Sequence, residues 1–429
     1  MMICLSMFAL TISSCSVTTS TTASVAPTTA AAATTAGTTK AGEATVAGTT
    51  AASGKNPIKI AAIFAKSGGM AESGEMCLDG AALAVKHINE KGGIKSLGGR
   101  PIELVIFDET SDPAQVKNVG ERALSDSSIV AAIGGSNSAL TIPMLPAFEK
   151  AKVPIVTFNN AKDVTNQGYN YVFSITNRGT EIGNYTVKYL DYMNKNMDAK
   201  LKKVAIIYEN SANGINMADG ARANLKSLGL EIVFDQSYPA GTVDFAPMIT
   251  TIKNSNADVV LPFGYMQEGK LIMTTMRDLK YYPLVMSNTV WPSFYKALGD
   301  ASNGVIASGN WNWDTKTIQD NPEYTKIVKE FEATYGYYMT EHSGPAYESL
   351  RIIANAIEKS GSLDPKVIRD TISSTELPGM QLGGPYKFNE KGENVNGIPA
   401  VSQWQYGKPV CIFPAEYAGA KYIAPADFK

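Results

Sequence analysis

The chain has 429 residues, with 38 Lys and Arg, 40 Asp and Glu, 2 His and 4 Cys, and its formal net charge is −2. This length suffices for two domains and a tail, and the small net charge excludes the positive field that nucleic-acid binding requires. Two histidines also leave little scope for metal or imidazole chemistry. We therefore expect no metal, no cofactor and no nucleic-acid partner.

The first apolar run, Met1–Ile12, is too short to span a bilayer, which takes about 20 residues. Small residues and then Cys15 follow it. This order is typical of a bacterial export signal with a lipoprotein cleavage site. We expect residues 1–15 to be a signal peptide with lipobox and Cys15 to carry the lipid. The protein would then be exported and anchored to the outer face of the cell membrane, or periplasmic.

Residues 16–55 consist mainly of Thr, Ala and Ser, without any aromatic residue, Leu or Ile. Such a segment cannot bury enough apolar surface to offset the entropy of ordering it, so we expect a disordered linker. Cys77 and Cys411 would be the thiols left after processing. One lies in a helical pattern and the other in a strand pattern, which favours two separate buried thiols over a disulfide.

From Pro57 onward, short apolar runs alternate with segments of helical period. The first predicted series is strand Ile58–Ala65, helix Gly74–Lys91, strand Ile102–Asp108, helix Pro113–Ser125, strand Ile129–Gly134, helix Thr141–Lys150 and strand Pro154–Phe158. The second is strand Lys203–Tyr208, helix Gly214–Leu228, strand Glu231–Tyr238, helix Asp244–Asn254, strand Asp258–Phe263, helix Glu268–Leu279 and strand Pro283–Ser287. Helices Asn321–Tyr335 and Ser343–Lys359 and an aromatic hairpin, Ala400–Phe413, complete the prediction. This alternation indicates an α/β protein with two doubly wound parallel sheets.

Ligands bind beyond the carboxyl ends of the strands in such sheets, so the residues that follow predicted strands are candidates. They are Lys66–Gly69, Gly135–Ser138, Asn159, Asn160, Glu209–Asn213, Tyr265, Asn288, Thr289 and Trp291. Trp311 and Trp313 follow a further apparent strand, Val305–Ser308. Gly135–Ser138 is the most specific stretch, because backbone N–H groups before a helix and two hydroxyls suit a carboxylate. The alternatives are that a serine only caps the helix, that the asparagines are turn residues and that the aromatic residues belong to the core.

Enzyme motifs are missing from this pattern. The sequence has no G-x-G-x-x-G that fits Gly68–Gly74, no P-loop and no G-x-S-x-G elbow. His87 lies in a predicted helix and His342 just before another, and neither has a nucleophile or second ligand at motif spacing. We interpret both as structural or solvated and expect a protein that is not an enzyme.

Several segments resemble the leucine/isoleucine/valine-binding proteins, the type I periplasmic binding proteins that serve ABC importers. They are IKIAAIFAKSGG from Ile58, GAALAVKHINEKGGI from Gly80, LVIFDETSDPAQV from Leu104, Gly134–Ser138 and GPYKFNEKG at Gly384–Gly392. The resemblance covers nearly everything from Lys55 to Phe413. It implies two Rossmann-like lobes that close over a small ligand.

The resemblance also implies three crossings between the lobes, near Ile175–Gly179, Gly309–Trp311 and Phe388–Asn396. Lobe 1 would comprise residues 56–178 and 311–388, and lobe 2 would comprise 179–310 and 389–429.

The ligand-binding residues that the resemblance implies come from both lobes. Ser136, Asn137 and Ser138 would hold the ligand carboxylate, and Asn159, Asn160 and Ala161 would add backbone and side-chain contacts. Tyr265 would cover the ligand from the second lobe, with Trp291 nearby.

This chain departs from the family pattern at three positions. The first-lobe aromatic residue is Ser73, a second-lobe tyrosine is Asn213, and the acidic partner of the ligand ammonium is replaced by Thr289. A buried ammonium without a carboxylate is costly. Substitute acids that the sequence offers are Glu268, Glu209 and Asp163.

Two ligand classes therefore stay open: an amino acid with a rearranged ammonium pocket, or an amine-free aromatic or keto acid held against Trp291, Trp311 or Trp313. We predict an extracytoplasmic solute-binding protein of an ABC importer that binds a branched-chain or other hydrophobic amino acid. Its partners would be this small carboxylated solute, the permease, and the membrane through the lipid anchor. A sensory ligand-binding module is the alternative of another class.

Overall fold

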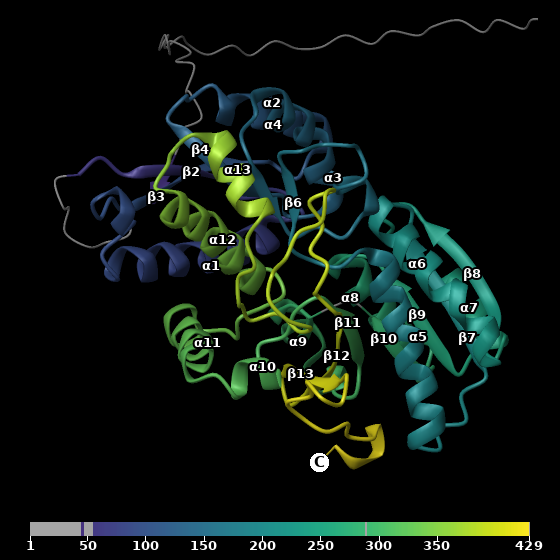
Figure 1. Cartoon of the computed structure of the whole chain (residues 1–429). Coiled ribbons are helices and arrows are strands. Elements are labelled where there is room, and N and C mark those ends of the chain that lie inside the picture. The colour runs from purple at the N-terminus through teal and green to yellow at the C-terminus, as the bar shows by residue number, and fades with distance from the viewer. Residues whose placement is uncertain (1–43, 47–54, 288–289, 429) are drawn as a thin grey trace, which may run out of the picture. The chain divides into compact units, whose positions relative to one another are not determined.

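The computed structural model describes residues 44–46, 55–287 and 290–428 (Figure 1). The strands of the first sheet are β1 Ala44–Val46, β2 Ile58–Phe64, β3 Ile102–Asp108, β4 Ile129–Gly134, β5 Ile155–Thr157 and β6 Val172–Ser174. Those of the second sheet are β7 Lys203–Glu209, β8 Glu231–Tyr238, β9 Val259–Phe263, β10 Leu284–Ser287, β11 Ile306–Gly309, β12 Ala400–Gln405 and β13 Lys408–Phe413.

The two sheets share one topology. The first has the order β1-β3-β2-β4-β5-β6, and the second has the order β13-β12-β11-β10-β9-β7-β8. Within them, β3-β2-β4-β5-β6 and β8-β7-β9-β10-β11 are parallel, and both follow the doubly wound order 2-1-3-4-5. In such sheets the switch point lies between the first and third strands. Here it lies between β2 and β4 in one sheet and between β7 and β9 in the other.

Helices cover both faces of the first sheet. On one face lie α1 Ala71–Glu90, α11 Pro322–Tyr335, α12 Ser343–Ser360 and α13 Pro365–Ser373. On the other face lie α2 Pro113–Leu124, α3 Ser138–Thr141 and α4 Leu145–Ala151. The strand β2 is apolar from Ile60 to Phe64 because both of its faces are covered: Ile60 belongs to the core under α1, and Ile63 to the core under α2.

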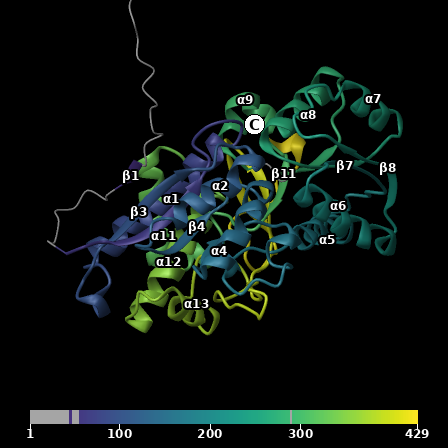
Figure 2. The same cartoon turned by 90° about the horizontal axis from the view of Figure 1, so that it is seen from above.

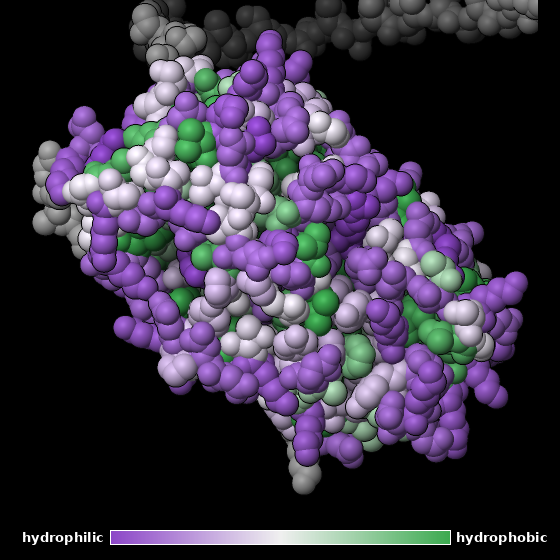
Figure 3. Space-filling view, viewed as in Figure 1, coloured by the Kyte–Doolittle hydropathy of each residue, from purple (hydrophilic) through white to green (hydrophobic). Residues whose placement is uncertain are grey.

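The second sheet is covered in the same way. One face carries α5 Gly179–Asn196 and α6 Ala212–Leu225, and the other carries α7 Ala246–Asn254, α8 Met266–Asp278 and α9 Pro292–Leu298. The short helix α10 Lys316–Gln319 precedes α11. Figure 2 shows α5, α6 and α7 grouped with β7 and β8, and α1, α2 and α4 grouped with β3 and β4. On the face seen in Figure 3, polar and charged residues predominate and apolar residues are scattered.

Glycines bring helices into backbone contact in each half. A Cβ at Gly80 of α1 would lie 2.0 Å from the carbonyl oxygen of Ser343 in α12. A Cβ at Gly220 of α6 would lie 2.0 Å from the carbonyl oxygen of Thr180 in α5. Any side chain at either position would push the paired helices apart.

The chain passes between the two sheets three times, and asparagines tie these crossings together. Asn394, on the third crossing, donates from Nδ2 to the carbonyl oxygen of Ile175 on the first at 2.9 Å. Asn310, on the second crossing, accepts from the backbone N–H and the side-chain amide of Asn177, each at 3.0 Å. This arrangement confirms the predicted two-sheet α/β fold. The residue boundaries assigned to the two lobes stay a prediction.

The structure corrects some element predictions. The helix expected at Thr141–Lys150 is divided into α3, the 3-10 turn Ile142–Met144 and α4. Pro143 and Pro146 are the cause, because a proline has no N–H to donate to the preceding turn. The strand β6 and the helices α5, α9, α10 and α13 were not predicted. The expectation of a disordered linker over residues 16–55 was wrong for Ala44–Val46, which form β1 and pair antiparallel with β3. Cys77 and Cys411 are both free and buried, as predicted.

Candidate functional site

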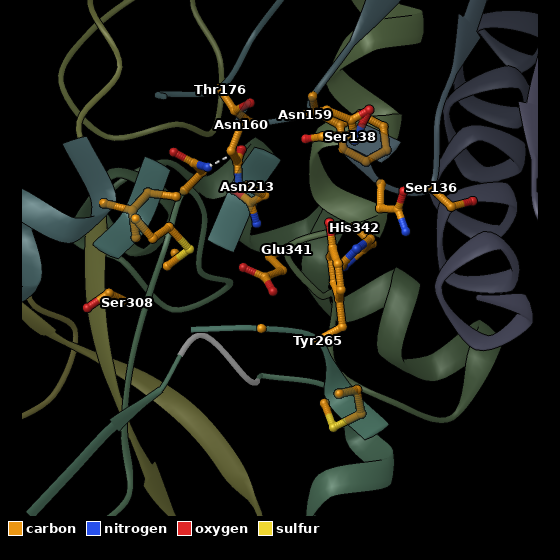
Figure 4. Close-up of a pocket in the computed structure, with 18 of the residues that line it drawn as sticks. Ser136, Ser138, Asn159, Asn160, Thr176, Asn213, Tyr265, Ser308, Glu341 and His342 are labelled. Atoms are coloured by element: carbon orange, nitrogen blue, oxygen red, sulfur yellow. Dashed lines mark hydrogen bonds between the residues drawn. The ribbon is translucent and has the colours of Figure 1, made fainter. Parts of the chain in front are cut away.

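One cavity collects most of the residues that the sequence singled out. It lies at the carboxyl ends of strands from both sheets and includes residues that follow both switch points (Figure 4). The predicted residues that line it are Ser136, Asn137, Ser138, Asn159, Asn160, Asn213, Tyr265 and Trp291. Thr289 and Cys15 lie outside the described residues. Ala161 is buried and lines an adjacent cavity instead.

The loop between β4 and α3 is shaped by Gly135 and Asn137. Gly135 has a φ of 92°, and a Cβ there would lie 1.8 Å from Thr141 Oγ1, so this turn needs glycine. Asn137 is the N-cap of α3, and its Oδ1 accepts from the N–H of Leu140 at 2.9 Å. The Oδ1 of Asn137 is therefore occupied in capping, and its Nδ2 is left as a donor at the cavity.

Ser136 has a structural role, whereas it was predicted to hold the ligand carboxylate. Its hydroxyl accepts from the N–H of Ala65 at 2.9 Å, and its own N–H donates to Glu109 Oε1 at 2.7 Å. Figure 4 shows the hydroxyl directed away from the cavity. Ser136 thus joins the end of β2 to β4, and its hydroxyl is not a donor to a ligand. Burial raises the pKa of the Glu109 carboxyl to about 7, although its hydrogen bonds from Ser136 oppose this.

Ser138 lies in the wall of the cavity. Its oxygen accepts from the N–H of Ala161 at 3.2 Å, which leaves the hydroxyl hydrogen free to donate. Figure 4 shows the hydroxyl directed into the cavity.

The loop after β5 supplies two amides, the buried one of Asn159 and the half-buried one of Asn160. Asn159 donates to the carbonyl oxygen of Gly135 at 3.0 Å and accepts from Thr157 Oγ1 at 3.0 Å, so it holds two loops together. Asn160 Oδ1 accepts from Asn310 Nδ2 at 2.7 Å. This bond fixes the orientation of the amide and leaves the Nδ2 of Asn160 as a donor.

The wall from the second sheet is formed by residues at helix N-termini. Asn213 is the second residue of α6, and Tyr265 and Trp291 are the N-caps of α8 and α9. Asn213 Oδ1 and Tyr265 Oη are buried without a hydrogen-bond partner among the described residues. Buried polar atoms are normally paired, so these two atoms suit a bound ligand. Burial also raises the pKa of the Tyr265 phenol, which keeps it a neutral donor.

None of the acids suggested as ammonium partners lines the cavity. Glu209 and Glu268 are buried behind Tyr265, and Asp163 is exposed on the 3-10 turn Lys162–Val164. Burial first, and then the carboxylate of Glu268, raise the pKa of Glu209 to about 7.

Glu341 and His342 line the cavity. Glu341 was not among the predicted residues, and His342 was expected to be structural or solvated. They belong to the connector between α11 and α12. Burial raises the pKa of Glu341 to about 8, against the lowering effect of a hydrogen bond from Trp291. Burial lowers the pKa of His342 to about 4, so it is neutral at pH 7. The His342 ring packs edge-on against Trp291, with centroids 5.0 Å apart, and against Phe158, at 6.4 Å.

The signal that could have found Glu341 is its place two residues before α12, whose N-terminus favours a negative charge. Further lining residues that were not predicted are Phe158, Thr176, Ile182, Met217, Met266, Ser308, Gly309 and Asn310. Trp311 and Trp313 do not line the cavity. Trp311 is buried against Gly344 of α12, and Trp313 Nε1 donates to the carbonyl oxygen of Pro409 at 2.9 Å. The proposed contacts of a ligand with these two tryptophans were wrong.

Two doubly wound sheets, three crossings and one cavity lined from both sides define a two-lobed binding protein of type I. A family model described as "Periplasmic binding protein" matches residues 57–408. The chain belongs to this family, in the group that resembles the Leu/Ile/Val-binding proteins.

Similar proteins agree with this assignment. Leu/Ile/Val-binding protein homolog 7 of Brucella abortus (strain 2308) is 26% identical over 375 residues, which cover 85% of this chain and 93% of the relative. Homolog 8 of Brucella suis is 27% identical over 380 residues, with 85% and 92% covered.

Solved structures share the fold. LivJ from Streptococcus pneumoniae, in complex with isoleucine, has a TM-score of 0.73 at 24% identity and covers 82% of this chain and 98% of its own. A solute-binding protein from R. palustris, in complex with benzoate, has a TM-score of 0.72 at 20% identity, with 86% and 98% covered.

The family makes the chain a solute-binding protein rather than an enzyme, as expected, and implies export from the cytoplasm. Among the described residues, no helix is long and apolar enough to cross a membrane. Across the same residues, no group of three or more His, Cys, Asp or Glu side chains could hold a metal ion.

Proposed function

We propose that this protein is the extracytoplasmic solute-binding component of an ABC importer and that its ligand is a small carboxylated solute, a branched-chain or other hydrophobic amino acid. The observation that carries the proposal is the cavity itself. Ser138 and Asn160 face it from one sheet, and Asn213, Tyr265 and Trp291 face it from the other. A solute that contacts both walls is held between them.

The lining suits a carboxylate joined to an apolar body. The free hydroxyl hydrogen of Ser138 and the Nδ2 of Asn160 are donors for a carboxylate, and such charge-assisted hydrogen bonds are strong. Phe158, Met266 and Trp291 offer apolar surface for a hydrophobic side chain. The isoleucine complex of LivJ and the benzoate complex of the R. palustris protein support a small carboxylated ligand.

Transport follows from closure of the two lobes. A ligand shifts an equilibrium between open and closed forms only by its differential affinity for them. Contacts made from both walls exist together only in the closed form, so the solute favours that form. The permease would then distinguish loaded from empty protein by the positions of the lobes.

Localisation is part of the same proposal. Cys15 would carry a lipid anchor after removal of residues 1–14, and residues 16–43 would tether the binding domain to the membrane. Metabolic labelling with a fatty-acid analogue tests this, with Cys15→Ser as the unlabelled control. Equal labelling of both proteins would overturn the lipid anchor.

A thermal-shift screen of the purified protein against the twenty amino acids, aromatic acids and short keto acids tests the ligand class. Binding to the native state alone raises the melting temperature by mass action. We expect a rise with leucine, isoleucine, valine or phenylalanine. A shift with none of the carboxylated solutes would overturn the proposal.

A further inference from the structure

We propose that Glu341 binds the ammonium group of the solute and thereby makes the cavity select an amino acid over the same acid without its amine. This inference rests on the proposed function, because it concerns the same cavity. It assigns the charge recognition to the connector before α12 and not to the loop after β10, where the sequence has Thr289.

The carboxylate of Glu341 has no cationic partner within the part of the chain that the structure describes. Burial and a hydrogen bond from Trp291 are the influences on its ionisation, and no Lys or Arg acts on it. Its neighbour His342 is neutral at pH 7, because burial lowers the pKa of that ring to about 4. A negative charge that faces a cavity without a counter-ion is stabilised by a cation brought by the ligand.

The position of this carboxylate depends on Gly309 at the end of β11. A Cβ at Gly309 would lie 2.5 Å from Glu341 Oε2, closer than a carbon and an oxygen can approach. The absence of a side chain at residue 309 therefore leaves the space that the carboxylate occupies.

Glu341 and Ser138 provide the two groups that a zwitterionic amino acid needs, one for its ammonium and one for its carboxylate. Figure 4 shows the Glu341 carboxylate and the Ser138 hydroxyl directed into the same space. Ser138 offers a donor for the ligand carboxylate, and Glu341 offers an acceptor for the ligand ammonium.

The other acids of the neighbourhood are engaged elsewhere. Glu268 Oε1 accepts from the N–H of Gly241 at 3.1 Å, and neither it nor Glu209 lines the cavity. Asp163 is exposed. Glu341 is the carboxylate that lines the cavity.

Binding of an ammonium to this group should displace a proton. The titratable groups beside Glu341 are Tyr338 and His342 of its own connector and Tyr265 of α8, and all three are neutral at pH 7. With a pKa of about 8, Glu341 is about 1% ionised at pH 6 and about half ionised at pH 8. If only the ionised form binds the amino acid, its affinity should rise about 50-fold over this range.

Calorimetry with two pairs of probes tests the proposal: leucine with 4-methylpentanoate, and phenylalanine with 3-phenylpropanoate. For the wild-type protein we expect at least tenfold tighter binding of one amino acid than of its amine-free partner. Titrations at pH 7 in buffers of different ionisation enthalpy should show release of close to one proton with the amino acid.

Three variants complete the test. Glu341→Gln should lower the affinity for the amino acid at least tenfold and abolish the proton release. It should keep the affinity for the amine-free acid within about threefold of the wild-type value. Gly309→Ala should act in the same direction by displacing the carboxylate. Glu268→Gln removes a buried acid behind Tyr265 and should keep the wild-type preference.

The outcomes separate the two proposals. Equal binding of leucine to the wild type and Glu341→Gln, or equal wild-type affinity for both members of each pair, would overturn the assignment of Glu341 while the proposed function stands. If no carboxylated probe binds the wild type, the proposed function fails, and this inference fails with it.

Discussion

Asn310 Nδ2 lies 2.7 Å from Asn160 Oδ1, and this hydrogen bond joins the end of β11 to the loop after β5. The same Asn310 accepts two hydrogen bonds from Asn177 on the first crossing. One amide thus connects two of the three crossings to the wall of the cavity. The orientation of the Asn160 amide is therefore tied to the geometry of the crossings.

Asn310→Ala should lower the free energy of unfolding by about 1–3 kcal/mol, because it leaves the half-buried amide of Asn177 without its acceptor. Urea denaturation measures this change. Asn254→Ala, at an exposed position at the end of α7, is the control and should change the value by less than about 0.5 kcal/mol. Equal effects of the two substitutions would contradict the role of Asn310.

Ser138→Ala should weaken binding of the solute by about 0.5–3 kcal/mol, since a charge-assisted hydrogen bond to its carboxylate is lost. Calorimetry with leucine, or with another solute that the thermal-shift screen identifies, gives the value. Ser136→Ala is the matched control, because the hydroxyl oxygen of Ser136 accepts a hydrogen bond from the N–H of Ala65 and points away from the cavity. Ser136→Ala should change the affinity by less than about threefold. An unchanged affinity in Ser138→Ala would show that Ser138 does not bind the solute.

Tyr265→Ala should weaken the binding of any ligand with an apolar body by about 1–3 kcal/mol, because the aromatic ring expected to cover the ligand is lost. Tyr265→Phe retains the ring and separates its effect from that of the hydroxyl. Tyr282→Ala removes a tyrosine that is 75% exposed and should leave the affinity unchanged. Calorimetric affinities that fall equally in Tyr265→Ala and Tyr282→Ala would speak against a specific role of Tyr265.

Glu109 should make stability depend on pH. Its pKa rises from the ordinary 4.5 to about 7 on folding, so the folded state holds the proton more tightly. The resulting stabilisation is fully present below about pH 4.5 and is lost as the pH rises through 7. Between pH 5 and 8 we expect the unfolding free energy of the wild type to fall by roughly 1–3 kcal/mol more than that of Glu109→Gln.

Glu390→Gln removes an exposed carboxyl and is the control for this measurement. It should follow the wild-type pH dependence. Parallel curves for the wild type and Glu109→Gln would show that Glu109 is already ionised when folded.

The sequence predicted the two sheets because most of their central strands are buried on both faces. Such strands appear as continuous apolar runs, as in Ile129–Gly134, and the residues after them fall at one edge of a sheet. Ser138, Asn160 and Tyr265 could be placed at the cavity by this rule alone.

The features that were missed have physical reasons. The hydrophobic face of α5, with Ile182, Val187 and Leu190, has helical spacing but contains a threonine and two glycines that weaken the pattern. The sequence signal for α13 is its N-terminus, where Asp364 is the N-cap and Pro365 lies in the first turn, more than its apolar residues.

Glu341 could not be found by the rule that finds the other residues, because no strand precedes it. Its neighbourhood arises only when α12 packs on the first sheet and the second sheet brings Gly309 and Trp291 to it. Ser136 shows the reverse case. Its position at a strand end is as predicted, but the direction of its hydroxyl depends on Ala65, which lies 71 residues away in the chain.

The contact of Gly80 with the carbonyl oxygen of Ser343 fixes the height at which α12 starts on α1. Ser343 follows Glu341 by two residues, so a glycine on the outer layer of the first lobe sets how far that acid reaches inward. A side chain at residue 80 would therefore shift the start of α12, and with it the position of Glu341 at the cavity.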